Sequence, residues 1–208
     1  MADPVRRVRL DPAQRRDQLL ALGMEVFTRS GLDRISIDEI AKAAGISKGL
    51  LFHYFPNKRG FQLEIVRRAS AELLAATAPD PELAPMQRLR DSLERYVDYV
   101  SERRDAYISQ LRGPASADPE FVAVFEANRA RTVARVLDSL PALDGVEFDR
   151  TQVEVAVRGW VAFVEETTIS WLRGQQISRD RLVEMNLRAL PAVALPPQVA
   201  GLLLAPKP

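Results

Sequence analysis

Residues 36–58 constrain the fold more than any other part of the chain. Ser36 followed three residues later by Glu39 is the capping-box signal for the start of a helix. Gly45 predicts where that helix ends, because glycine adopts the left-handed conformation of a helix end at little cost. Between these signals, apolar residues recur at helical spacing and give the helix one buried face: Ile37, Ile40, Ala41 and Ala44.

A second short helix is predicted directly after this turn. Ser47 is a capping residue, and Pro56 predicts the end of the helix at Phe55, because the residue before a proline is biased away from helical dihedrals. A helix, a glycine turn and a short second helix form the helix-turn-helix pattern, whose second helix enters the DNA major groove. The segment therefore predicts DNA binding.

The segment 47–58 resembles the signature of the TetR family of transcriptional regulators. Its recognition helix has a small or basic start, a run of aromatic residues and a closing lysine, here Lys58, and a long fourth helix follows. The detailed resemblance covers roughly residues 11–60, and the rest agrees in length and helical character. It implies an all-α fold with a three-helix helix-turn-helix DNA-binding domain at 11–57 and a helical ligand-binding and dimerisation domain at 58–192.

Composition excludes several other classes of protein. The chain has no cysteine and one histidine, so disulfides, thiolate metal sites and cysteine nucleophiles are excluded, and a multi-histidine zinc site is too. The first residues lack the apolar region of a signal peptide, and no apolar run approaches the ~18 residues of a membrane span. We expect a cytoplasmic protein without cofactor, catalytic machinery or membrane contact.

The small net charge of +1 conceals an asymmetry along the chain. Residues 1–60 hold 11 Lys or Arg against 7 Asp or Glu, whereas residues 61–208 hold 18 against 21. This distribution is typical of a DNA-contacting head on a body that avoids DNA, although scatter on a solvated surface would also produce it.

Almost every other segment also reads as a helix. Cap-plus-proline signals open helices after Asp11 and Asp118, and Asn57, Asp149 and Ser178 are further predicted caps. We expect loops at 113–117 and 141–148, and a ninth helix that ends before Pro191. A proline-rich, partly mobile tail should follow at 193–208.

Eight residues are predicted to contact DNA, because they lie in or beside the recognition helix or because they match positions that contact DNA in the family. They are Ser36, Lys48, Gly49, Leu50, Phe52, His53, Tyr54 and Lys58. Lys48 is placed to reach a phosphate or a guanine edge, and Gly49 permits close approach of the backbone. Arg6, Arg7 and Arg9 could form a minor-groove arm or a solvated terminus.

Two of these residues depart from the family pattern. The family more often has a small polar residue where this chain has Leu50, so Leu50 either packs on thymine methyl groups or is buried against the first helix. The family usually has a tyrosine where this chain has Phe52, so the packing is kept and a phosphate hydrogen bond is lost.

Long apolar seams occur on the predicted eighth and ninth helices. Pairing of these helices between two subunits would build a dimer interface, as the resemblance implies; the alternative is that the seams serve only the core of one subunit. The predicted interface residues are Val157, Trp160, Val164, Trp171, Leu182 and Asn186. Aromatic residues and a carboxylate could line a ligand cavity, although such residues are usually core: Tyr96, Tyr99, Tyr107, Phe125, Phe163 and Glu166.

These observations predict a homodimeric repressor that binds a palindromic operator in double-stranded DNA and is released by a small apolar or amphipathic effector. Activation is the alternative within the same class. From other classes, the chain could be a helical small-molecule enzyme or a protein-binding adaptor that carries a helix-turn-helix. Turnover of candidate ligands would identify the enzyme, and salt-dependent binding to a specific duplex would exclude the adaptor.

Overall fold

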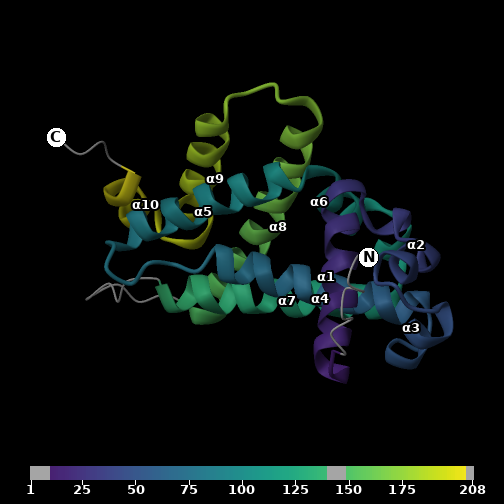
Figure 1. The fold of residues 1–208 in the computed structure, drawn as a ribbon. Coiled ribbons are helices and arrows are strands. Elements are labelled where there is room, and N and C mark those ends of the chain that lie inside the picture. The colour runs from purple at the N-terminus through teal and green to yellow at the C-terminus, as the bar shows by residue number, and fades with distance from the viewer. Residues whose placement is uncertain (1–9, 140–148, 205–208) are drawn as a thin grey trace. The chain divides into compact units, whose positions relative to one another are not determined.

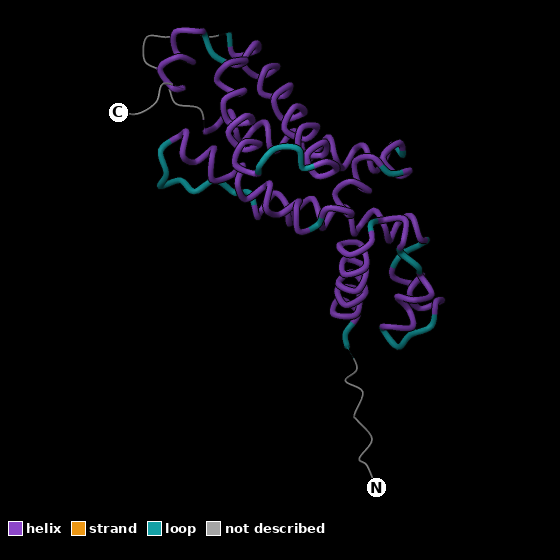
Figure 2. The backbone as a smooth tube through the Cα atoms, turned by 90° about the horizontal axis from the view of Figure 1, so that it is seen from above, coloured by secondary structure: helices purple, strands orange, loops and turns teal. Residues whose placement is uncertain are grey.

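The computed structural model describes residues 10–139 and 149–204, and every regular element within these ranges is a helix (Figures 1 and 2). The helices are α1 (Pro12–Ser30), η1 (Leu32–Arg34), α2 (Ile37–Ala43), α3 (Lys48–Tyr54), α4 (Lys58–Ala76), α5 (Pro85–Glu102), α6 (Arg104–Arg112), η2 (Pro114–Ala117), α7 (Pro119–Ser139), α8 (Arg150–Gly174), α9 (Arg179–Ala194) and α10 (Pro197–Leu204). The all-α prediction is confirmed.

The chain forms two compact units. The first runs to Ala69 and also contains Asp105–Ser116, and the second is Ser70–Arg104 continued from Ala117 onward. The units therefore divide within α4, whereas the predicted boundary lay between residues 57 and 58. Helix α6 belongs to the first unit although it lies between α5 and α7 in the sequence. No local pattern in the sequence of α6 indicates that it packs with helices far from it along the chain.

In the first unit, α1 has a complete capping box at its start. The Gln14 N–H donates to Asp11 Oδ1 at 2.8 Å, and the Asp11 N–H donates to Gln14 Oε1 at 3.1 Å. Four residues of α1 are buried: Leu19, Leu20, Gly23 and Phe27. An added Cβ at Gly23 would lie 2.6 Å from Ile65 Cδ1 and 2.7 Å from Phe61 Cζ. Helices α1 and α4 therefore approach each other closely at this glycine.

Helix α6 is attached to the turn between α1 and η1. Gly31 ends α1 with a φ of 83°, a backbone conformation that favours glycine. An added Cβ there would lie 2.9 Å from both Cβ and Oγ of Ser109, and the Leu32 N–H donates to Ser109 Oγ at 3.2 Å. Ala106 and Tyr107 are buried. Ser109 thus holds α6 against this turn through a close contact and a hydrogen bond.

In the second unit, α8 and α9 lie side by side (Figure 1), and α5 and α7 pack against them. Asp149 caps α8 by accepting from the Thr151 N–H at 2.9 Å. The core combines residues from all four helices: Leu93, Val97, Val133, Val153, Val157, Trp160, Val161, Val164, Leu182, Val183, Leu187, Leu190 and Ala194. Burial of this many aliphatic side chains is the main stabilising term of the unit.

The C-terminal segment differs from the prediction. Helix α9 continues through Pro191 to Ala194, and α10 follows. Pro191 removes one backbone hydrogen bond, but Leu190, Pro191 and Ala194 are buried, so tertiary packing outweighs the local penalty. The predicted proline-rich tail at 193–208 was therefore wrong as far as Leu204. The predicted loop at 113–117 contains the short helix η2, and the predicted loop at 141–148 lies outside the described residues.

Candidate nucleic-acid interface

Helices α2 and α3 are joined by the tight turn that the sequence predicts. The Ser36 hydroxyl accepts from the Glu39 N–H at 3.4 Å at the start of α2. Gly45 has a φ of 66° in the turn, and the Ile46 N–H donates to Ala41 O at 3.0 Å. Ser47 then caps α3 by accepting from the Leu50 N–H at 3.2 Å. Local hydrogen bonds therefore fix the direction in which α3 leaves the turn.

Helix α3 turns most of its surface outward. Among its seven residues only Leu51 is buried, at 0% exposed. Lys48, Gly49, Leu50 and His53 are exposed, while Phe52 and Tyr54 are half-buried. A helix with so little of its own surface in the core contributes little to stability for its length, which favours a role in contacting a partner.

The end of α3 is anchored by aromatic packing. Phe55, 1% exposed, contacts Phe61 edge-to-face with 4.8 Å between ring centroids. Arg16 lies over the Phe55 ring at 5.1 Å and donates to Glu64 on α4 at 2.6 Å. Burial raises the pKa of Glu64, but hydrogen bonds from Arg16 and Arg67 outweigh it, so the pKa lies below its ordinary value. These contacts fix α3 and the beginning of α4 relative to α1.

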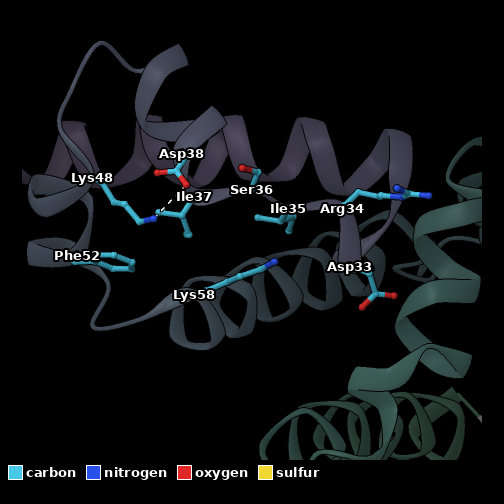
Figure 3. A pocket seen from close by; sticks show the side chains of 9 residues that line it. All are labelled: Asp33, Arg34, Ile35, Ser36, Ile37, Asp38, Lys48, Phe52 and Lys58. Atoms are coloured by element: carbon cyan, nitrogen blue, oxygen red, sulfur yellow. Dashed lines mark hydrogen bonds and ion pairs between the residues drawn. The ribbon is translucent and has the colours of Figure 1, made fainter.

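A surface cavity of about 470 Å³ lies between η1, α2, α3 and the first residue of α4 (Figure 3). Its walls contain both charged and apolar side chains: Asp33, Arg34, Ile35, Ser36, Ile37, Asp38, Lys48, Phe52 and Lys58. Four of the eight predicted DNA-contacting residues, Ser36, Lys48, Phe52 and Lys58, are therefore brought together around one opening. The other four lie elsewhere on α3.

The cavity also contains charged residues that the sequence analysis missed. Lys48 Nζ pairs with Asp38 Oδ2 at 3.1 Å, and Asp33 and Arg34 complete the charged wall. The sequence could predict the position of Asp38 but not its ion pair. Its position in the first turn of α2 is visible in the sequence and is favourable for a helix N-terminus, but its pairing with a residue ten positions later depends on the angle between two helices.

Two residues of α3 now have clearer roles. Leu50 is 40% exposed, so its burial against the first helix is excluded. An added Cβ at Gly49 would meet only Ser47 Oγ, at 3.9 Å, so packing within the chain does not require glycine there. Because glycine is a poor helix former, its presence is better explained by close approach of something outside the chain.

Most of the residues predicted for the dimer interface are buried within this chain. Five of the six lie within the core of the second unit and are 0–6% exposed: Val157, Trp160, Val164, Leu182 and Asn186. The Trp160 indole N–H donates to Asn186 O at 2.8 Å within the same chain. Side chains already removed from solvent cannot bury more surface against a second subunit. Trp171 is half-buried, and its indole N–H donates to Ile177 O at 2.8 Å.

The predicted ligand-pocket residues do not share one environment. Tyr107 belongs to the first unit and the other five to the second. Phe163, 40% exposed, and Glu166 lie on the exposed side of α8. Phe125 is buried and Tyr96 packs against the core.

Tyr99 is half-buried, with Arg103 over its ring at 4.0 Å. Burial raises the pKa of Tyr99, and the Arg103 guanidinium partly offsets that rise. Its phenol is thus uncharged at neutral pH.

Within residues 10–139 and 149–204, the single histidine and the carboxylates form no cluster that could hold a metal ion. Across the same residues, no helix combines the length and the apolar character that crossing a bilayer requires.

Comparison with known sequences agrees with this geometry. The family model for bacterial regulatory proteins of the tetR family matches residues 19–65, and the model for the tetracyclin repressor-like C-terminal domain matches residues 85–193. The HTH-type transcriptional activator FasR of Mycolicibacterium smegmatis is 28% identical over 179 residues, which covers 85% of this chain and 81% of FasR.

Solved structures show the same fold. A tetR-family transcriptional regulator from Streptomyces coelicolor superimposes with a TM-score of 0.78 at 30% identity, covering 93% of this chain and 85% of that one. FadR of Thermus thermophilus, a transcriptional repressor crystallised with lauroyl-CoA, superimposes with a TM-score of 0.62 at 24% identity. That alignment covers 93% of this chain and 98% of FadR, and at this identity it concerns the fold alone.

Proposed function

Because the chain belongs to the TetR family of DNA-binding transcriptional regulators, we propose that it represses transcription by binding a palindromic operator as a homodimer and is released by a small ligand. The family is one of regulators and not of enzymes. We assign DNA binding to the first unit, and ligand binding and dimerisation to the second. Its site of action would be the cytoplasm, where a bacterial chromosome lies.

The outward surface of α3 carries this proposal. Six of its seven residues are not buried, and they combine the cation Lys48, an exposed Leu50 and a glycine that internal packing does not require. Lys48 would reach a guanine edge or a phosphate. Lys58, at the start of α4, would bring its charge and the free amides of a helix N-terminus to a second phosphate. Phe52 provides packing without a hydroxyl.

Selection of bound fragments from genomic or random DNA by the full-length protein tests the proposal. We expect a recovered sequence with two-fold symmetry, because two recognition helices must enter successive major grooves about 34–36 Å apart. Binding that shows no sequence preference at physiological salt would contradict the proposal. It would favour the protein-binding adaptor as the alternative.

For dimerisation, we propose a face of α8 and α9 different from the one that the sequence suggested. Apolar residues follow each other at intervals of four along both helices, and all of them are exposed except the half-buried Ala189: Val155, Gly159 and Phe163 on α8, and Met185, Ala189 and Val193 on α9. Val155 is 67% exposed and Val193 56%. Contiguous exposed apolar surface is typical of an interaction site. Sedimentation analysis of the full chain would give the oligomeric state.

The proposed effector is apolar or amphipathic. Three of the predicted pocket residues, Tyr96, Tyr99 and Phe125, are aromatic residues of the second unit that are buried or half-buried. FadR shows that this fold can accommodate an amphipathic acyl-CoA. The protein would have one conformation that fits the operator and one that does not. A ligand that binds only the second conformation would shift the population toward it.

Such a ligand should raise the melting temperature and release the operator at the same concentrations. Screening fatty acyl compounds and aromatic metabolites by thermal shift and then by operator release tests this. Release by strongly charged compounds alone would contradict an apolar effector.

Activation is the second candidate function, because FasR is named an activator and aligns over 85% of this chain. Transcription in vitro from a promoter that contains the selected sequence distinguishes the two. Repression predicts less transcript when the protein is added, whereas activation predicts more.

A further inference from the structure

An acidic residue lies directly beside the cation expected to contact DNA. Asp38 occupies the first turn of α2, and its Oδ2 atom is 3.1 Å from Lys48 Nζ (Figure 3). Both side chains are well exposed, Lys48 at 52% and Asp38 at 72%. Figure 3 shows the lysine extending from α3 across the mouth of the cavity toward α2, so that its ammonium group meets the carboxylate and not solvent alone.

Stability does not explain this pair. Exposed ion pairs contribute little to folding, because water screens the attraction and two side chains lose freedom. Asp38 also lies near the positive end of α2, but Glu39 in the same turn has that location without the contact to Lys48. The feature peculiar to Asp38 is therefore its partner.

The pair has unequal consequences for different DNA sequences. Binding to an arbitrary duplex depends almost entirely on cations meeting phosphates. A carboxylate on this surface repels phosphates and competes for Lys48, so it weakens that binding. At the operator, Lys48 would reach a guanine edge, which is an uncharged acceptor that the carboxylate does not repel, whereas on arbitrary DNA the same ammonium group meets a charged phosphate. A nearby acid thus weakens arbitrary binding more than specific binding.

We propose that Asp38 is a specificity-determining residue, which restrains Lys48 so that the protein discriminates its operator from other DNA. This inference rests on the proposed DNA-binding function. Its chemistry is the competition of one carboxylate with DNA phosphates for one ammonium group. In general terms, an acidic residue on a DNA-binding surface raises its selectivity for the operator, although it lowers its affinity for DNA as a whole.

The Asp38→Asn substitution tests this with little change in size. Glu39→Gln is the matched control, because it removes the same charge from the same helical turn. Each full-length variant is titrated with two duplexes, the one recovered by selection and a scrambled duplex of equal composition, over a range of salt concentrations. Thermal melting checks that both variants fold like wild type.

We expect Asp38→Asn to bind the scrambled duplex more tightly, on the order of eightfold at 0.1 M salt, because one further phosphate contact adds about 0.9 to the salt slope. Operator affinity should rise by less, so the ratio of the two affinities falls. Glu39→Gln should change the ratio much less. In a Lys48→Gln background most of the effect of Asp38→Asn should disappear, because the cation that it releases is gone.

Three results would overturn the inference: an equal change for both duplexes, an equal effect of Glu39→Gln, or an unchanged effect in the Lys48→Gln background. All three leave the proposed function intact if the wild-type protein still selects a symmetric sequence. Failure of wild-type selection would instead remove the proposed function, and this inference with it.

Discussion

Helices α3 and α8 use their residues in opposite ways. Helix α3 buries only Leu51 and presents the rest of its surface outward, whereas α8 buries eight residues, including Val157 and Trp160. The short helix is held in place by its neighbours, and the long one holds its unit together. Outward residues in α3 are thus available for chemistry with a partner, whereas the apolar seam of α8 is already occupied by its own chain.

The largest effect is expected from an aspartate on the buried side of α8, compared with an aspartate on its exposed side. Val157→Asp should destabilise the protein by about 3–5 kcal/mol, because it places an unpaired charge at a site with no exposure. Val155→Asp, at a site 67% exposed, should fold normally but lose dimerisation. Chemical denaturation and sedimentation measure the two effects. An unchanged dimer for Val155→Asp would place the interface elsewhere.

Gly23→Ala should have the next largest effect and concerns the support of α3. The added methyl would overlap Ile65 and Phe61, which are both fully buried and cannot easily move. We expect a loss of about 1–3 kcal/mol in the free energy of unfolding, the usual range for overpacking. Denaturant titration with unchanged stability would show that α1 and α4 are packed less closely than the structure indicates.

The next prediction tests whether the exposed Leu50 of α3 contacts DNA. If Leu50 packs on a thymine methyl group, replacing that thymine by uracil in the operator should weaken binding by about 0.8 kcal/mol, the value of one buried methylene. For Leu50→Ala, the same uracil replacement should have no effect. A scan of uracil substitutions with both proteins measures this. Equal sensitivity of the two proteins at every position would exclude the contact.

The smallest effects are expected for alanine substitutions at two glycines that have free space around them. Gly49→Ala on α3 and Gly159→Ala on α8 should each stabilise the free protein by about 0.5–1 kcal/mol, because nothing lies within 3.4 Å of either added Cβ. Gly49→Ala should nevertheless weaken operator binding, and Gly159→Ala should weaken the dimer instead. Thermal melting, DNA titration and sedimentation distinguish them. Operator binding equal to wild type for Gly49→Ala would mean that DNA does not approach this backbone.

The sequence was sufficient for the fold and for the helix-turn-helix, because Ser36, Gly45 and Ser47 specify caps and a turn through local hydrogen bonds. It was insufficient for the dimer face. An apolar stripe such as Val157 and Val164 has the same spacing whether it packs on its own chain or on another, and only the tertiary structure shows which surface remains exposed.

The same limit applies to Asp38 and to the end of α9. The ion pair of Asp38 depends on the angle between α2 and α3, which no local pattern specifies. Pro191 lies inside a helix because buried neighbours compensate for its missing N–H. In both places, tertiary contacts decide what the local sequence leaves open.

The most direct test of the account is the salt dependence of DNA binding for Lys48→Ala, measured on the selected operator against wild type. Arg131→Ala on α7 is the control, because it removes a positive charge that is also exposed, but from the second unit. We predict that Lys48→Ala weakens binding and, if Lys48 contacts a phosphate of the operator, lowers the salt slope by about one, whereas Arg131→Ala leaves both close to wild type. Wild-type affinity and slope for Lys48→Ala would contradict the assignment of α3 as the helix that contacts DNA.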